Sequence, residues 1–261
     1  MKRIHNFKHW ILFLLIIAPV RVWSGPDRFY LGTEVDGLEY KEPFMKQVGL
    51  LLGLRTEFQH DLESNFTALN ELGLNLKLLT GRLNYDGETW GGRPLAASNQ
   101  FTLYEVSSQG GWNIGSHLRP FVGLGLRGTF QNRESTNDYR REYYYLYSEF
   151  GSQFQFRLQK ESVILISLQE NMMVGGYNKS YLSEMPQHLP DVVVNFTSGL
   201  ATQVAIKFQW RKNDAQIIRC GLNFLNWEVQ QSQVANIGLG NQVFEPINQS
   251  QVLGLELDYL Y

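Results

Sequence analysis

Apolar and polar side chains alternate along much of this chain, and the alternation is clearest in its last segment, residues 251–261. One face of this segment carries Leu253, Leu255, Leu257, Tyr259 and Tyr261, and the other carries Gly254, Glu256, Asp258 and Leu260. A period of two is that of a β-strand. The apolar face needs a cover of other apolar groups, because soluble proteins rarely expose large apolar patches.

The same alternation predicts ten strands and an all-β fold. We expect these strands at residues 28–40, 48–58, 72–85, 101–114, 120–131, 143–158, 163–177, 192–211, 217–230 and 252–261. An even number of antiparallel strands returns the C-terminus to the side on which the first strand begins. Eight or twelve strands would result if a hairpin near Phe66 or Ile237 is split or merged. Glu170 falls on the apolar face of its strand, which indicates a bulge or a shifted register there.

Connection length and aromatic residues distinguish the two ends of the expected strands. Short connections are centred on residues 116–119, 159–162 and 212–214, and the sequence leaves the length of the one centred on residues 59–64 open. Longer connections cover residues 41–47, 86–100, 132–142, 178–190 and 231–250. The end with short turns holds Phe29, Phe58, Trp112, Phe121, Phe156, Trp210 and Tyr259, and the end with long loops holds Tyr40, Tyr85, Phe101, Phe130, Tyr144, Tyr177, Phe196 and Trp227. Two aromatic girdles and this asymmetry of loops are typical of transmembrane barrels.

The first 24 residues have the features of a secretory signal peptide. Lys2, Arg3 and Lys8 are basic, residues 10–18 are apolar, and Gly25 would follow the cut. The apolar run is too short to cross a bilayer, which takes about 20 residues. We therefore expect a signal peptide at residues 1–24 and one domain at residues 25–261.

Composition narrows the class of protein further. Without the signal segment the chain carries 19 Lys+Arg against 25 Asp+Glu, a net charge of −6, which disfavours binding to nucleic acid. Cys220 is the single cysteine and cannot form an internal disulfide. No apolar run of the mature sequence is long enough for a transmembrane helix, so a closed barrel is the remaining way to cross a membrane. We expect no cofactor and no metal.

The alternation, the asymmetry of the loops and the aromatic Tyr261 resemble those of bacterial outer-membrane β-barrels of the broad porin-like superfamily. The resemblance covers the mature chain and implies a single antiparallel up-and-down transmembrane barrel in the outer membrane of a Gram-negative bacterium. It implies that Leu257, Tyr259 and Tyr261 form the assembly signal. It also implies contacts with outer-membrane lipid, lipopolysaccharide, the barrel assembly machinery and periplasmic chaperones. The alternative is a soluble β-sandwich or lipocalin-like barrel with an apolar interior.

Acidic and basic residues are nearly balanced on the expected inner face. The acids are Glu34, Glu57, Glu105, Glu149, Glu256 and Asp258, and the bases are Arg55, Lys77, Arg127, Arg157, Lys207 and Arg219. A lone buried charge is costly, so we expect these residues to form a network of ion pairs. The interior of a barrel of about ten strands is near the width that side chains can fill. We favour a plugged lumen, and a narrow pore lined by charge is the alternative.

Residues 123–128 match the dinucleotide-binding pattern G-x-G-x-x-G. That site needs a strand, a turn and a helix, whereas this motif lies within one expected strand. We interpret Gly123 and Gly125 instead as space for bulky neighbours across the lumen.

The positions of the histidines do not favour a catalytic site. His60 and His117 lie in expected turns and His188 lies in a long loop, so no two are expected to share a metal or a proton relay. His188 with Glu184 and Asp191 is the one grouping at the loop rim that a hydrolase could use. We expect no catalytic residues.

Residues 139–147 hold five tyrosines and two arginines at an expected surface end. Tyrosine and arginine are frequent in recognition hot spots, and arginine also pairs with phosphate. The candidates for surface recognition are Tyr139, Arg140, Arg141, Tyr143 and Tyr145. The alternative is a tyrosine girdle at the end of this strand, which explains Tyr144 well and its inward neighbours less well.

These expectations favour a non-enzymatic barrel with a plugged polar lumen, whose five surface loops serve envelope integrity or adhesion to an unidentified partner. A narrow passive pore or small-solute transporter is the alternative, and a rim-site hydrolase is a third hypothesis.

Overall fold

The structure is a computed structural model, and it describes residues 27–62, 69–88, 92, 94–132, 139–185, 189–213, 216–238 and 241–260. The expected signal segment lies outside the described residues. So do Phe66, His188 and Tyr261, and what the sequence predicts for them stays a prediction.

Long antiparallel strands make up most of the described chain. They are β1 (Asp27–Glu42), β2 (Met45–Asp61), β3 (Glu71–Glu88), β4 (Pro94–Gly111), β5 (Leu118–Asn132), β6 (Arg141–Arg157), β7 (Ser162–Ser180), β8 (Val192–Phe196), β9 (Gly199–Asn213), β10 (Gln216–Val229), β11 (Ala235–Gly238), β12 (Asn241–Val243) and β13 (Asn248–Leu260). A short 3-10 helix, η1 (Leu182–Glu184), follows β7. No helix among the described residues is long and apolar enough to cross a membrane.

The strands close into a barrel. Each wall strand pairs with its neighbours in sequence, β6 pairs with β7, and β1 pairs with β13 to complete the ring. β8 and β9 together occupy one position in the wall, while β11 and β12 form a separate hairpin. The predicted fold class, an antiparallel up-and-down barrel of ten strands, is confirmed.

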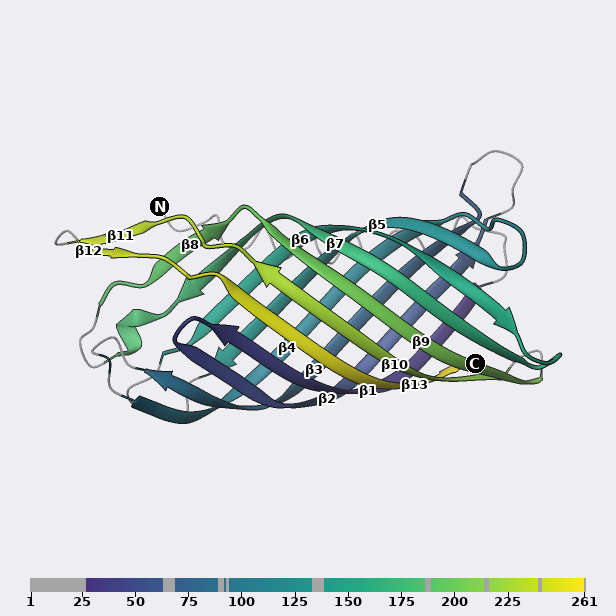
Figure 1. The fold of residues 1–261 in the computed structure, drawn as a ribbon, viewed down its shortest axis with the longest axis horizontal. Helices are drawn as coiled ribbons and strands as arrows, with labels where there is room; N and C mark the ends of the chain where they lie inside the picture. The colour runs from purple at the N-terminus through teal and green to yellow at the C-terminus, as the bar shows by residue number, and fades with distance from the viewer. Residues whose placement is uncertain are drawn as a thin grey trace, which may run out of the picture.

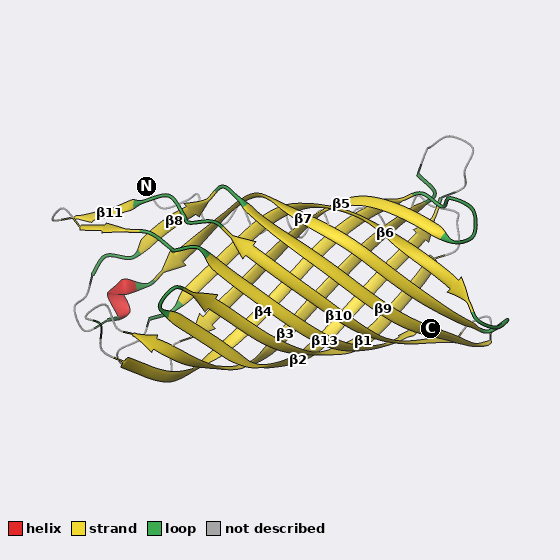
Figure 2. Ribbon diagram, viewed as in Figure 1, coloured by secondary structure: helices red, strands yellow, loops and turns green. Residues whose placement is uncertain are grey.

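The barrel has two different ends, and the strands run between them at a steep tilt (Figure 1). The terminal end is where β1 begins and β13 finishes, since Tyr30 pairs with Leu260. The loop end carries η1 and the β11–β12 hairpin, which projects beyond the wall (Figure 2). In outer-membrane barrels the end with the chain termini faces the periplasm.

Two connections are shorter than the sequence predicts. A tight turn at residues 43–44 joins β1 to β2, and residues 89–93 alone separate β3 from β4, where long loops are expected at residues 41–47 and 86–100. The connection at residues 62–70, whose length the sequence left open, is long. On the outer face of the first hairpin, Glu39 forms ion pairs with Lys41 and Lys46. The first two strands therefore continue past the apolar part of the wall with charged residues on their outer face.

Large apolar side chains cover the outer wall. Those that are more than half exposed include Leu50, Leu52, Leu54, Leu78, Leu124, Leu253, Leu255 and Leu257. The alternating neighbours Glu256 and Asp258 are buried in the lumen. This placement is the reverse of that in a soluble barrel, whose large apolar side chains point inward.

The wall strand at residues 192–213 is not one regular strand as the sequence predicts. It breaks at residues 197–198, and the break exchanges the two faces. Val194 and Phe196 in β8 are buried inside, although the uninterrupted alternation placed them outside. Beyond the break, Leu200 and Ile206 in β9 face outward as expected.

A bulge interrupts β7, but it does not turn Glu170 inward. The register shifts where Leu146 pairs with Gly175 and the next residue, Tyr147, pairs with Met173, so that Val174 is the extra residue. Glu170 lies before this bulge and faces outward between Leu168 and Met172. Glu170 therefore lies on the apolar outer face, as the uninterrupted alternation of the sequence places it.

The loop half of the lumen is filled by an apolar and aromatic cluster, which we call the aromatic layer. It comprises Leu38, Leu51, Leu79, Leu83, Phe101, Leu103, Tyr143, Tyr145, Tyr147, Met173, Phe196, Ala201, Leu225, Trp227, Val229 and Val252. The Tyr145 ring centroid lies 5.8 Å from that of Trp227 and 5.7 Å from that of Phe196. Aromatic packing at these distances is favourable and excludes water.

Five aromatic residues that the sequence places in the girdles lie inside the barrel instead. Phe101, Phe196 and Trp227 belong to it, and Tyr40 and Phe121 are also buried inside the barrel. On the outer wall near the loop end, aromatic rings contact one another from strand to strand, stacked in the first and last pair and edge to face in the middle one. Their centroids are 5.6 Å apart for Tyr104–Phe130, 6.0 Å for Phe130–Tyr144 and 4.7 Å for Tyr144–Tyr177.

Glycines in β5 make room for their neighbours on β6. Gly125 pairs with Tyr147, and Gly123 pairs with Glu149. A methyl group added at either glycine would overlap the paired side chain. The expectation of space for bulky neighbours holds, but those neighbours come from the adjacent strand.

We predict that Gly125→Ala destabilises the barrel by about 1–3 kcal/mol, because the new methyl group displaces Tyr147 from the aromatic layer. Gly175→Ala is the matched control, since a methyl group there meets no atom within 4 Å. Urea unfolding of both variants in lipid vesicles measures the difference. Equal midpoints for the two variants would show that the aromatic layer is loosely packed.

Candidate functional site

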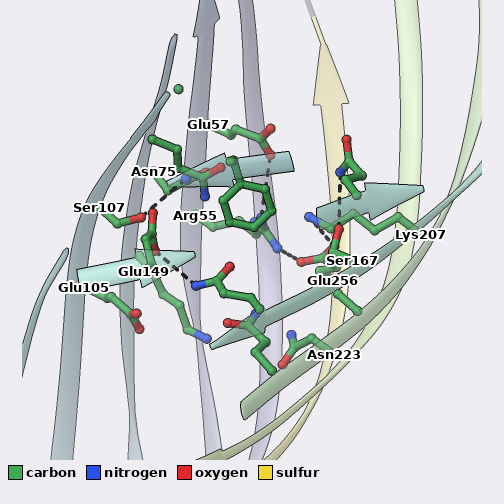
Figure 3. A pocket seen from close by; sticks show the side chains of 18 of the residues that line it. Arg55, Glu57, Asn75, Glu105, Ser107, Glu149, Ser167, Lys207, Asn223 and Glu256 are labelled. Carbon is green, nitrogen blue, oxygen red and sulfur yellow. Dashed lines mark hydrogen bonds and ion pairs between the residues drawn. The ribbon is translucent and has the colours of Figure 1, made fainter. Parts of the chain in front are cut away.

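The lumen is the candidate functional site, and its terminal half is held together by ion pairs that converge on Arg55. From β2, the Arg55 guanidinium contacts Glu256 and lies 3.3 Å from Asp258 Oδ1. Glu34 and Glu57 lie slightly farther away, at 3.9 and 3.8 Å. Three strands, β1, β2 and β13, are thereby joined through one side chain (Figure 3).

Arg219 forms a second centre on β10. Its Nη2 lies 2.7 Å from Glu57 Oε2 and 3.1 Å from Asp258 Oδ2, and its Nη1 donates a second hydrogen bond to Glu57. The guanidinium carbon also lies 3.5 Å from the ring centroid of Tyr30. Two hydrogen bonds to one carboxylate combined with a contact to an aromatic face is a geometry that arginine provides and lysine does not.

Two lysines complete the network. Lys77 Nζ lies 2.6 Å from Glu34 Oε1 and 2.9 Å from Asp36 Oδ2, and Lys207 Nζ lies 2.8 Å from Glu256 Oε1. Asp36 is absent from the candidates chosen from the sequence, although its alternation places it on the inner face. The alternation of the first strand was therefore sufficient to identify Asp36 as a residue of the lumen.

Glu105 and Glu149 lie on another side of the lumen. Glu105 lies 3.4 Å from Arg127 and accepts a hydrogen bond of 2.5 Å from Tyr147. Glu149 is buried and accepts a hydrogen bond of 3.1 Å from Gln169. Within the described part of the chain, Glu149 has no ion pair.

A polar cavity of about 160 Å³ lies among these groups. Arg55, Glu57, Glu105, Glu149, Lys207 and Glu256 line it (Figure 3). The expected lumen residues are thus brought together, with one exception. Arg157 is exposed at the terminal rim and forms no ion pair with a described residue, because β6 ends there.

A further group of ion pairs near the terminal end escaped the sequence analysis. Arg28 Nη2 lies 2.5 Å from Asp61 Oδ1 and 3.2 Å from Glu71 Oε2, and Arg119 Nη2 lies 2.6 Å from Glu71 Oε1. These residues fall at strand ends, where alternation is no longer informative. They extend the ionic filling toward the terminal opening.

At the loop end the lumen closes differently. Tyr143 donates a hydrogen bond of 2.5 Å to Glu245, which comes from the segment before β13, and Arg141 lies 3.9 Å from both Glu245 and Glu42. A cavity of about 300 Å³ opens above these groups. The long segment between β10 and β13 is therefore anchored across the mouth.

The expected surface cluster of tyrosines and arginines is corrected. Tyr143 and Tyr145 are 2% and 6% exposed and point into the lumen, because they lie on the inner face of β6. Arg141 lines the mouth cavity together with Tyr139. Arg140 remains at the rim, where its guanidinium lies 3.8 Å from the Tyr181 ring centroid.

The described members of the rim grouping contact neighbours. Glu184 Oε1 lies 3.6 Å from Arg140, and Asp191 accepts hydrogen bonds of 2.7 and 3.1 Å from the Oγ and the backbone N of Ser183. The hydrogen bonds from Ser183 hold the pKa of Asp191 below its usual range. Among the described residues, no group of three or more His, Cys, Asp and Glu side chains could hold a metal ion.

Among known proteins, similarity is found with solved structures and not at the level of sequence. No protein-family model matches the sequence, and no curated protein matches it. The outer membrane protease OmpT from Escherichia coli is similar over 92% of this chain and 99% of its own, with 7% identity and a TM-score of 0.52. The transport unit of the autotransporter AIDA-I from Escherichia coli covers 97% of each chain, with 10% identity and a TM-score of 0.46. At such identities the OmpT comparison shows the fold alone, and this chain has the fold of bacterial outer-membrane β-barrels.

We predict that Arg219→Met destabilises the barrel by about 3–5 kcal/mol, because it removes the closest cation from the buried carboxylate of Glu57 and leaves Arg55, at 3.8 Å, as its remaining ion-pair partner among the described residues. Combining it with Glu57→Gln should restore part of the loss, which a double-mutant cycle in urea measures. Lys46→Met, which removes an outer ion pair with Glu39, is the control and should leave the unfolding midpoint unchanged. Additive effects of the two lumen substitutions would contradict a direct pair.

Proposed function

We propose that this protein is a non-enzymatic barrel of the bacterial outer membrane, closed to solutes, which presents its loop end as an interaction surface. The observation that carries the proposal is the double filling of the lumen, by ion pairs in one half and by the aromatic layer in the other. A barrel filled in this way is a rigid support rather than a conduit.

The aromatic layer separates the two cavities. Tyr147 hydrogen-bonds to Glu105, which lines the polar cavity, and Tyr143 hydrogen-bonds to Glu245, which lines the mouth cavity. Leu79, Leu83 and Leu103, each at most 1% exposed, pack between them. Apolar constrictions block ions by excluding water. This arrangement favours a closed lumen over the narrow pore.

The outer wall supports the location in the membrane. Its exposed leucines provide the apolar band that lipid requires, and the row of contacting rings from Tyr104 to Tyr177 lies where a headgroup girdle is expected. Lys179 and Arg140 flank Tyr181 just beyond that girdle and are suited to phosphates of lipopolysaccharide. Leu257 and Tyr259 face outward on β13, consistent with an assembly signal read from the last strand.

A hydrolase at the rim receives less support. OmpT is a protease, but its similarity concerns the fold, and the described rim acids Glu184 and Asp191 already contact Arg140 and Ser183. Neither acid is left as the partner of a catalytic base. The loop end is therefore better suited to binding than to turnover.

We predict that the purified protein gives no stepwise conductance in planar bilayers. A variant with Tyr145→Ala and Trp227→Ala should conduct, because it removes two large rings from the aromatic layer. Its matched control is Tyr144→Ala with Tyr177→Ala, which removes two rings from the outer wall and should stay silent. Regular conductance steps from the unmodified protein would overturn the closed-barrel proposal in favour of the pore.

A further inference from the structure

The mouth cavity at the loop end has walls that are largely apolar and aromatic. Phe44, Tyr85, Leu182, Val192 and Val243 are among the side chains that line it. Its volume of about 300 Å³ falls at the lower end of the range typical of small-molecule sites, about 300–1,000 Å³. The cavity is therefore large enough for a small organic ligand.

The charged groups of this cavity are out of balance. Glu42, Glu88 and Glu245 line it, whereas Arg141 is the single base among the described residues that do. The Glu42 and Glu245 side chains are each only 11% exposed, and Arg141 Nη1 lies 3.9 Å from both, too far for a direct hydrogen bond to either. One arginine thus serves two largely buried carboxyl groups. An anionic ligand would add to the excess of negative charge, and a cationic one would offset it.

A proton offsets part of this excess at neutral pH. Burial and the nearby Glu245 carboxylate raise the pKa of Glu42 to about 7. Glu42 is the last residue of β1 and lies outside the apolar part of the wall. The titratable groups that face it are Tyr40, Arg141, Tyr143, Tyr145 and Glu245. Arg141 is the one base among them, so a bound cation can take the place of the proton.

We propose that the mouth cavity binds a small organic cation with an apolar body, whose charged group pairs with Glu42 and Glu245. The inference rests on the proposed role of the loop end as an interaction surface, and it names the class of ligand. A metal ion alone would leave the apolar walls against water, so the walls favour an organic body. The rings of Phe44 and Tyr85 suit both parts of such a ligand, because aromatic faces attract cations and pack against apolar groups. On binding, Glu42 releases its proton to the solvent and pairs as a carboxylate with the ligand.

Two probes of the same shape test the recognition of charge. 2-Phenylethylamine carries an ammonium group, and 2-phenylethanol is its neutral counterpart. Calorimetric titration of the barrel in phosphatidylcholine nanodiscs at pH 8, with empty nanodiscs as the blank, should show the amine binding about tenfold more tightly than the alcohol, because the ammonium group adds a charged hydrogen bond. Equal affinities for the two probes, or no binding of the amine, would overturn the proposal.

The same titration at pH 6 tests the exchange of proton for cation. Affinity for the amine should fall about tenfold from pH 8 to pH 6, because at the lower pH Glu42 must first give up its proton. Affinity for the alcohol should stay the same, since its binding displaces no proton. An amine affinity that does not change with pH would contradict the role given to Glu42.

Glu42→Gln tests the residue itself, and Glu39→Gln on the outer face of the same strand is the matched control. The Glu42 variant should bind amine and alcohol alike at both pH values, while the control should behave as the unmodified protein does. Alcohol binding by the Glu42 variant reports that its cavity is intact. Full amine affinity in that variant would remove Glu42 from the site. The proposed closed lumen is tested separately, because conductance by a protein that still selects the amine would contradict only the closed lumen.

Discussion

The need to pair buried charges governs the rest of this structure. Arg55 and Arg219 each contact more than one carboxylate, and their partners lie on β1, β2 and β13, so the network joins the first and last strands of the barrel. Removing any one member leaves a charge in a desolvated interior, which costs far more than the loss of a surface pair. The ionic half of the lumen consequently holds the barrel closed where its two terminal strands meet.

The aromatic layer follows from the same constraint. Water in a wide lumen would compete for the ion pairs and weaken them, since charges interact more strongly where the local dielectric is low. Leu79, Leu83 and Leu103 with the rings of Tyr145, Tyr147 and Trp227 close the lumen above the network. The ion pairs fix the strands, and the aromatic layer keeps water from reaching the pairs from the loop end. This division explains why the barrel interior is neither uniformly polar nor uniformly apolar.

The sequence predicts the strands and the outer wall well, because in each strand the alternation of apolar and polar residues separates the outer face from the face toward the lumen. It predicts the depth of a residue poorly. Arg157 lies on the expected face but at the exposed end of β6, and Trp227 and Phe101, which the sequence places in the aromatic girdle, fill the lumen. Near the loop end both faces of the wall carry aromatic residues, so hydrophobicity no longer distinguishes inside from outside. The break at residues 197–198 reverses which side chains of β8 face inward. No proline or charged residue marks it, so the alternation of the sequence could not predict that Phe196 lies in the lumen.

Spin labels placed one at a time along β13, from Val252 to Tyr259, test the central claim most directly. In lipid vesicles, labels at Leu253, Leu255, Leu257 and Tyr259 should be accessible to dissolved oxygen and shielded from a water-soluble nickel complex. Labels at the even-numbered positions between them should be immobile and shielded from both reagents, because those side chains point into a filled lumen. Nickel accessibility at the even-numbered positions would show a water-filled channel, and accessibility that does not alternate would contradict the membrane-spanning barrel itself.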